Sequence, residues 1–335
     1  MTKSILPEGY TPLLSIYETQ RAIGLLKRLF EDDLSGALRL HRVSAPLFVS
    51  ATSGLNDDLN GVERPVWFDI LETGEVAEVV HSLAKWKRMA LLKYGFPVHT
   101  GLYTDMNAIR RDEECDNIHS IYVDQWDWEK IITAEDRTED YLKATVRSIY
   151  GALLRTAKAV EKKYPCLVTY LPQQISFITT QELEDRYPDL SSKQREYEAA
   201  KEYGAVFIMK IGGRLKSGEK HDGRAPDYDD WDLNGDIILY NRVLDIPFEI
   251  SSMGIRVNRE SLLRQLKIEG KEERIKYEFH QMLLSGALPL TIGGGIGQSR
   301  LCMYLLHKAH VGEVQVSIWP EKEIQKCKKN GINLL

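Results

Sequence analysis

The chain has 335 residues, of which 43% are hydrophobic and 28% are charged, a composition that excludes disordered, collagen-like and low-complexity chains. Its net charge of −5 gives no overall attraction to nucleic acid or to an anionic membrane surface. Four scattered cysteines without a C-x-x-C pair, and the lack of a long apolar run, lead us to expect a cytoplasmic protein with reduced thiols.

Helices and paired strands alternate in the N-terminal half of the predicted structure. In chain order we expect a helix over 16–30, strands at 38–43, 68–70 and 77–80, a helix over 81–93, and strands at 101–108 and 120–128. Asp32, Asp33 and Gly36 are expected to end the first helix, and Pro46 is expected to end the edge strand after it. The strands at 68–70 and 77–80 should pair as a hairpin.

The C-terminal half continues this alternation. Here we expect helices over 141–163 and 191–203, strands at 205–211, 236–244 and 248–250, and helices over 259–266, 271–285 and 298–310. Strands that follow one another through hairpins favour an antiparallel or mixed sheet. Because no linker or repeat interrupts the pattern, we predict a single α+β domain over 1–335, with a helical insertion at about 130–204.

Residues 291–300 form a glycine-rich segment that we interpret as a turn leading into a helix. Such a turn can bring backbone amides close to a phosphate, but it is also common as a purely structural turn. The segment lacks the Lys-Ser/Thr ending of a P-loop, and Gly293, Gly295 and Gly297 do not have the spacing of the dinucleotide fingerprint. Arg300, on the first turn of the helix, favours a nucleotide site because arginine can stack on a base and pair with phosphate.

Acidic residues are dense in the segment before position 241. Residues 230–241 match most of a calcium-binding EF-hand loop, but Asn241 stands where a bidentate glutamate is needed, and glycine and proline just before the segment exclude an entering helix. The segment is therefore either a solvated loop or part of a magnesium and phosphate site. If the strands that carry Asp236 and Glu249 pair, both carboxylates can reach one cation.

Several other polar residues lie at positions where a binding role must be weighed against a purely structural one. Ser82 and Lys87 begin a basic helix and can hold a carboxylate, although an amphipathic helix with a solvated face has the same pattern. Gln125 and Asp127 alternate along an apolar strand, so they face the same way and need partners if buried. Arg110 either forms surface ion pairs or points at a phosphate. The eight histidines have neither zinc-binding nor triad spacing, so we expect no zinc site.

The order of these features resembles the catalytic core of class II aminoacyl-tRNA synthetases, and the early helix with its edge strand is similar to the dimer motif of that class. Within that superfamily the chain resembles the ammonia-dependent asparagine synthetases, or aspartate–ammonia ligases, over nearly its whole length. The stretches that carry this resemblance are 80–88, 122–129, 224–230, 251–256 and 291–301. Several such blocks in one order are far more specific than any single motif.

The resemblance implies an asparagine-forming reaction. In that reaction the side-chain carboxylate of aspartate attacks the α-phosphate of ATP, pyrophosphate leaves, and ammonia displaces AMP from the β-aspartyl adenylate. Met1 is followed by Thr2 rather than by a nucleophilic cysteine of the glutaminase type, which favours free ammonia as the nitrogen donor. The resemblance also implies ATP as a substrate, Mg²⁺ as a cofactor and a homodimer, with neither nucleic acid nor a membrane as a partner.

Roles for individual residues follow from the same resemblance. Arg110 would bridge the aspartate carboxylate and the α-phosphate, while Asp236 and Glu249 would hold Mg²⁺ between the phosphates. Asp57 would hold ammonium or receive its proton, because the attacking nitrogen must be neutral. The expected catalytic residues are thus Arg110, Asp57 and Gln125.

Substrate binding would involve two further sets of residues. Aspartate would be held by Ser82, Lys87, Gln125, Asp127, Ser252 and Arg256, with cations facing its carboxylates and anions its ammonium group. ATP would be held by Arg110, His119, Ser120, Val123, Asp236, Glu249 and Arg300. Within this second set, Arg300 would cover the adenine or reach the outer phosphates, and the strand at 119–123 would offer backbone groups to the adenine edge.

Two other kinds of function stay open at this point. A small relative of aspartyl- or asparaginyl-tRNA synthetase would make an α-carboxyl adenylate, but the chain leaves no room for an anticodon-binding barrel and its net charge is acidic. A non-catalytic regulatory paralogue or binding module is disfavoured because the arginines and acids for ATP chemistry are present. We expect Lys87, Arg110, Arg256 and Arg300 to converge on ATP and aspartate rather than on RNA.

Overall fold

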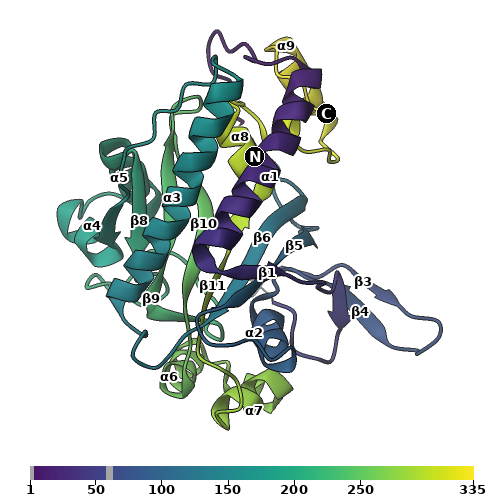
Figure 1. Cartoon of the computed structure of the whole chain (residues 1–335), viewed down its shortest axis with the longest axis vertical. Helices are drawn as coiled ribbons and strands as arrows, with labels where there is room; N and C mark the ends of the chain where they lie inside the picture. Colours follow the sequence, from purple (N-terminus) through teal and green to yellow (C-terminus); the bar gives the residue numbers. More distant parts are fainter. Residues whose placement is uncertain (1–3, 58–62) are drawn as a thin grey trace.

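A large mixed sheet organises the molecule, whose computed structural model describes residues 4–57 and 63–335 (Figure 1). In spatial order its eight strands are β1 Leu40–Arg42, β5 Gly101–Ile109, β6 Tyr122–Ile131, β11 Thr291–Gly297, β10 Ile246–Arg256, β9 Asp229–Asn241, β8 Ala205–Met209 and β7 Ser176–Thr179. Neighbouring strands are antiparallel except in the two outermost pairs, β1 with β5 and β7 with β8. The predicted α+β fold with an antiparallel core is confirmed.

Long helices cover one face of this sheet. α1 Ile16–Leu38 and α3 Glu139–Lys163 lie side by side across it, and α8 Gln298–Leu305 contacts α1 and β6 (Figure 1). The apolar stripes of these helices pack against strand residues such as Trp126, Trp128 and Phe207. The main hydrophobic core therefore lies between the helices and this face of the sheet.

The first helix is longer than the sequence predicted. It begins at a capping box in which the Ser15 hydroxyl accepts from the Glu18 amide at 3.2 Å. It then continues past the predicted stop, because Leu34 and Leu38 extend its buried apolar stripe. The helix ends where Arg39 adopts a left-handed conformation, with φ of 61°. Packing against the sheet thus outweighs the local signals that would end a helix earlier.

The opposite face of the sheet is covered at its β7–β8 end by α4 Thr180–Arg186 and α5 Ser192–Tyr203. Ala199 and Ala200 of α5 pack there in a small cluster with Val206, Ile208 and Ile238. The segment 130–204, predicted as a helical insertion, holds α3, α4 and α5. It also supplies the last residues of β6 and the edge strand β7, so part of it is built into the main sheet.

The glycine-rich segment forms a central strand, so the prediction of a turn there is wrong. β11 lies between β6 and β10 and pairs with both of them. A Cβ at Gly294 would lie 2.5 Å from the Cβ of Met253, and a Cβ at Gly295 would overlap the amide of Gln125. Glycine weakens strands in general, so the close approach of neighbouring side chains explains its presence here. The predicted helix after this segment is α8, although it ends earlier, at Leu305.

The remaining elements complete the arrangement around the sheet. The predicted hairpin is confirmed: β3 Trp67–Asp69 pairs with β4 Val76–Val79, β2 Phe48–Ser50 joins them, and the hairpin projects from the body (Figure 1). The segment predicted as one helix over 271–285 is divided into a 3₁₀ helix, Glu272–Lys276, and α7. The other helices are α2 Ala84–Lys93, α6 Arg259–Glu269, α7 Glu278–Leu284, the 3₁₀ helix Val311–Glu313 and α9 Glu321–Lys329. Within the described parts of the chain, no helix is both long and apolar enough to cross a membrane.

Candidate active site

A cavity of about 460 Å³ lies on the face of the sheet that points away from α1 and α3. β6 shows how the sequence builds it, because successive side chains of a strand point to opposite faces. Trp126 and Trp128 enter the helix-covered core, so Gln125 and Asp127 reach the cavity. All of the predicted site residues except Asp57 line this cavity; they are Ser82, Lys87, Arg110, His119, Ser120, Val123, Gln125, Asp127, Asp236, Glu249, Ser252, Arg256 and Arg300.

Lys87 and Asp127 form an ion pair in the wall of the cavity. Lys87 extends from α2 with only 1% of its side chain exposed, and its Nζ also donates to the carbonyl oxygen of Trp128 at 3.0 Å. The carboxylate of Glu129 lies 3.8 Å from the same ammonium. Burial lowers the pKa of Lys87 and raises the pKa of Asp127. Each of the two groups therefore depends on its partner to stay charged.

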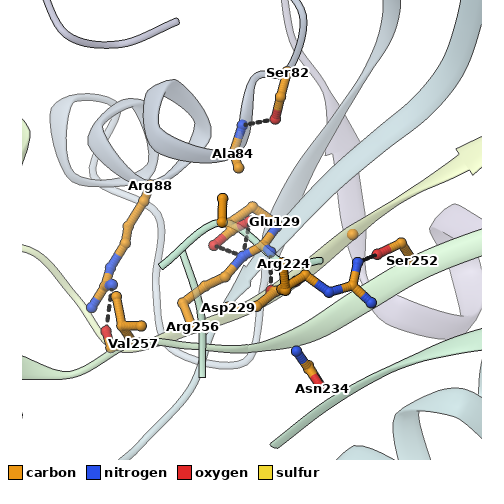
Figure 2. A network of polar contacts seen from close by, with 12 residues as sticks. Ser82, Ala84, Arg88, Glu129, Arg224, Asp229, Asn234, Ser252, Arg256 and Val257 are labelled. Carbon is orange, nitrogen blue, oxygen red and sulfur yellow. Dashed lines mark hydrogen bonds and ion pairs between the residues drawn. The ribbon is translucent and has the colours of Figure 1, made fainter. Parts of the chain in front are cut away.

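Two carboxylates hold Arg256 of β10 in a buried cluster (Figure 2). Arg256 donates to Glu129 Oε2 at 2.7 Å and to Asp229 Oδ1 at 2.5 Å. Burial alone would lower the pKa of Arg256, but these carboxylates raise it. The sequence predicted that this arginine binds aspartate. In the structure its side chain lines the cavity while its hydrogen bonds go to protein carboxylates.

Arg224 is a cavity residue to which the sequence analysis gave no role. Its Nη1 donates to the hydroxyl of Ser252 on β10, as Figure 2 shows, and its Nη2 donates to Asp236 Oδ1 on β9 at 2.6 Å. Only 10% of its side chain is exposed. The stretch 224–230 was part of the family resemblance, but a single arginine at the edge of an acid-rich segment has no spacing that marks it as a site residue.

Asp236 and Glu249 lie on β9 and β10, which pair with each other, so the condition for a shared cation site is met. Burial raises the pKa of Asp236 to about 6; Arg224 opposes this shift, and the Glu249 carboxylate adds to it. Two carboxylates that repel each other in a polar cavity are the oxygen donors that Mg²⁺ prefers, so these residues fit such an ion. Residues 230–241 are extended in β9, which excludes an EF-hand loop there.

Arg110 and Arg300 are the two arginines predicted to bind ATP. The guanidinium of Arg110 lies 3.5 Å from the carboxylate of Glu113, and its Nε has no hydrogen-bond partner among the residues that the structure describes. Arg300 donates from Nη1 to the carbonyl oxygen of Glu249 at 3.1 Å, which connects α8 to β10. Arg110 thus keeps a buried donor free in the cavity wall.

The predicted adenine-binding segment lies at the start of β6. Its side chains are occupied: the ring of His119 pairs with Asp116 at 2.9 Å, and the hydroxyl of Ser120 donates to Ser317 Oγ at 3.0 Å. His119, Ser120 and Val123 all line the cavity. Two backbone carbonyls of the segment are also occupied, since those of His119 and Ile121 accept from the amides of Asp116 and Arg110.

Asp57 is not among the described residues that line the cavity. It is buried beside two residues that do line it, His81 and Tyr228. Nδ1 of His81 lies 2.9 Å from the carbonyl oxygen of Asp57, and burial together with the Asp57 carboxylate raises the pKa of Tyr228. Neither His81 nor Tyr228 was predicted as a site residue, because no spacing marks a single histidine or tyrosine.

Comparison with known proteins identifies the family. The family model "Aspartate-ammonia ligase" matches residues 17–331. The chain is 62% identical to the aspartate–ammonia ligase of Clostridium perfringens over the full length of both chains, and 60% identical to that of Bacillus cytotoxicus, with 97% of this chain and 99% of the relative covered.

Solved structures show the same fold at low sequence identity. Asparaginyl-tRNA synthetase from Pyrococcus horikoshii, complexed with asparaginyl-adenylate, superposes with a TM-score of 0.65 at 14% identity, over 90% of this chain and 70% of that one. The Entamoeba histolytica enzyme gives a TM-score of 0.60 at 13% identity, over 90% and 66% of the two chains. The sheet is thus of the class II aminoacyl-tRNA synthetase type, and the chain belongs to the aspartate–ammonia ligase family.

Proposed function

We propose that the chain converts aspartate, ammonia and ATP to asparagine, AMP and pyrophosphate through a β-aspartyl adenylate. The family supports this reaction. The observation that most strongly supports this reaction is the composition of the cavity wall. Residues far apart in the sequence bring to this one site the charges that the reaction needs. These are the cations Lys87, Arg110, Arg256 and Arg300 and the carboxylates Asp236 and Glu249.

Formation of the adenylate requires two anions to approach each other, the aspartate carboxylate and the α-phosphate. Arg110 would bridge them, since a guanidinium can pair with both and its Nε has no partner among the described residues. Negative charge grows on the α-phosphate oxygens as the carboxylate attacks, so a fixed cation there stabilises the transition state more than the separate reactants. Arg300 and the backbone of 119–123 would hold the nucleotide in place.

Asp236 and Glu249 would hold Mg²⁺, which neutralises phosphate charge when it is bound. Arg224 shares the Asp236 carboxylate and keeps part of its charge balanced in the absence of the cation. The same arginine donates to the hydroxyl of Ser252, one of the residues predicted to bind aspartate. Arg224 would therefore connect the metal-binding and aspartate-binding sides of the cavity.

The amino acid would lie between charges of both signs. Asp127 and Gln125 would accept from its ammonium group, while Lys87, Ser82 and Ser252 would donate to its carboxylates, with Arg256 adding positive charge. Ser82 is held at the start of α2, where its Oγ accepts from the Ala84 amide at 3.1 Å (Figure 2). Asp57 would hold ammonium close to the β-carbonyl of the adenylate.

One assay tests this function against its alternatives. The chain is incubated with ATP, aspartate and ammonium, with and without tRNA, and free asparagine and aminoacylated tRNA are measured. Free asparagine formed without tRNA supports the proposal. Aminoacylated tRNA would instead indicate a synthetase that makes an α-carboxyl adenylate, and neither product would indicate a binding module.

We also infer one catalytic domain over 1–335, with residues 130–204 as an insertion, assembled as a homodimer in the cytoplasm. The continuous eight-stranded sheet supports a single domain. Ile16 and Tyr17 at the start of α1 are 53% and 72% exposed, and such apolar side chains favour burial against a second copy. All four cysteines are free, as expected in a reducing compartment. Light scattering after size exclusion tests the dimer.

A further inference from the structure

His81 is a buried cavity residue with an unused hydrogen-bonding atom. The residue is 2% exposed and lines the cavity. Its Nδ1 lies 2.9 Å from the carbonyl oxygen of Asp57. Its Nε2 is buried and finds no hydrogen-bond partner within residues 4–57 and 63–335. Buried polar atoms without partners are uncommon in folded proteins. We therefore expect Nε2 to form a hydrogen bond with a ligand when the cavity is occupied.

The contact with Asp57 fixes which nitrogen of the ring carries the hydrogen. A carbonyl oxygen can only accept, so Nδ1 must donate, and the neutral ring then presents a lone pair at Nε2. The backbone is held as well, because the His81 amide donates to Asn56 Oδ1 at 2.9 Å. The ring cannot turn over without losing its bond to Asp57. His81 is therefore an oriented acceptor.

The surroundings of this acceptor favour a cation with N–H donors. His81 lies between Ser82, predicted to bind aspartate, and Asp57, predicted to hold ammonium. The Asp57 carboxylate lies near Tyr228, another lining residue, so negative charge is close to the same part of the wall. The ammonium of the substrate aspartate has its own expected acceptors, Asp127 and Gln125. The reactant left for Nε2 is the ammonium ion.

We propose that Nε2 of His81 accepts the proton that ammonium must lose before its nitrogen attacks the adenylate. This role rests on the proposed function. Imidazole is suited to it, because a neutral ring whose Nδ1 carries the hydrogen has a lone pair at Nε2 that can take up a proton. The hydrogen bond from Nδ1 to the Asp57 carbonyl persists when the ring is protonated and stabilises the imidazolium.

The step balances without any further reactant. One N–H bond of ammonium breaks, and its proton goes to Nε2. The freed lone pair forms the C–N bond at the β-carbonyl carbon, and the bond between that carbon and the phosphate oxygen breaks, so that AMP leaves with the electron pair. The new nitrogen then loses its surplus proton to water, and the imidazolium returns its proton to solvent before the next turnover.

The variant His81→Asn separates this role from a structural one. Its amide nitrogen can still donate to the Asp57 carbonyl, but the acceptor at the position of Nε2 is gone. Three rates are measured on the full chain: aspartate-dependent exchange of pyrophosphate into ATP, asparagine formation with ammonium, and β-aspartyl hydroxamate formation with hydroxylamine. Hydroxylamine is neutral at neutral pH and needs no prior deprotonation. We expect a loss on the order of 10²-fold with ammonium, while the other two rates stay within about twofold of wild type.

A second variant and a control sharpen the test. His81→Gln places an amide near the position of Nε2 that cannot take up a proton, and it should show the same selective loss. The control is His99→Asn: His99 is outside the cavity and has φ of 62°, which asparagine tolerates, so all three rates should be unchanged.

Two results would overturn the role of His81. Equal loss of all three rates in both variants would show that the histidine only supports the fold, and an unchanged rate with ammonium would show that the proton goes elsewhere. The wild-type chain tests the proposed function separately. If it showed no aspartate-dependent exchange, the adenylate pathway would fail, and the role of His81 would fail with it.

Discussion

Arg224 donates a hydrogen bond to Asp236 across 2.6 Å in the wall of the cavity. Burial raises the pKa of Asp236 to about 6, and Arg224 works against this rise. Removal of the arginine should raise the pKa further, so that more Asp236 is protonated near neutral pH and binds Mg²⁺ less well. We expect Arg224→Gln to need several-fold more Mg²⁺ for half-maximal pyrophosphate exchange, with a larger increase at about pH 6.5 than at about pH 8.

The matched control for this prediction is Arg214→Gln. Arg214 is outside the cavity, and its guanidinium donates to the Gly218 carbonyl at 2.7 Å on the surface. Its loss should leave the Mg²⁺ requirement unchanged at both pH values. If the Mg²⁺ requirement of Arg224→Gln were also unchanged at both pH values, Arg224 would not be what keeps Asp236 ionised.

Arg110 should be needed for the first half-reaction. Arg110→Lys keeps the charge but loses the planar pair of donors that can bridge a carboxylate and a phosphate. We expect aspartate-dependent exchange of pyrophosphate into ATP to fall by about 10²-fold to 10³-fold. The control is Arg42→Lys, since Arg42 forms an exposed ion pair with Asp105 outside the cavity. Exchange at the wild-type rate in Arg110→Lys would remove Arg110 from the mechanism.

Asp57 should affect the second half-reaction only. Asp57→Asn removes the negative charge that would hold ammonium while leaving the backbone carbonyl that accepts from His81. We expect slower asparagine formation even at saturating ammonium, with pyrophosphate exchange unchanged. A normal rate of asparagine formation would contradict the assignment, and loss of both rates would indicate a structural role.

The alternation of side chains along β6 explains why Gln125 and Asp127, two residues of the cavity wall, could be predicted from the sequence. Gln125 and Asp127 are polar residues in an apolar strand, and the tryptophans between and after them fill the core. Such a pattern indicates that one face of the strand packs in the core while the other presents buried polar side chains that need partners. This pattern is visible in the sequence. The positions of Arg110, Asp236 and Glu249 could likewise be predicted, because each lies at or near a strand that the sequence marks clearly.

Other features depend on contacts that a sequence does not reveal. The glycines of β11 are typical of a turn in the sequence. Their role in a strand becomes clear only from the structure, where Gln125 and Met253 on the neighbouring strands leave no room for a Cβ. Arg224 and His81 have no distinctive spacing, and only the structure shows the residues that they contact, Asp236 and Asp57. The C-terminal end of α1 was predicted too early, because the local stop signals are real but the core holds Leu34 and Leu38 in the helix.

Glu129 should be a major contributor to stability. It pairs with Arg256 at 2.7 Å, and both side chains are almost completely buried. Glu129→Gln would leave the guanidinium with too little compensating charge, and we expect the free energy of unfolding to fall by about 3–5 kcal/mol. The control Glu139→Gln, in an exposed pair with Lys210, should cost about 0–1 kcal/mol. Denaturant titrations measure both values, and equal small losses would contradict the prediction.

His310 should make the fold sensitive to mild acid. Its Nδ1 accepts from the Gly312 amide at 3.0 Å, and its ring lies 4.7 Å from that of Trp319. Burial lowers the pKa of His310 from 6.5 to about 4, and the nearby carboxylate of Glu323 only partly opposes this. Between these two values the unfolded chain binds a proton that the folded chain does not, so the contribution of His310 to stability is complete above pH 6.5 and is lost as the pH falls towards 4.

The variant His310→Asn tests this link between protonation and folding. Its side-chain oxygen can still accept from the Gly312 amide, but it does not titrate. The variant should be less stable than wild type at neutral pH, because it loses the ring contact with Trp319. Its free energy of unfolding should nevertheless fall less on acidification, by about 3 kcal/mol over the interval in which His310 titrates. Denaturant titrations across this range measure the difference, and parallel pH profiles for the two proteins would show that His310 does not stay neutral in the folded chain.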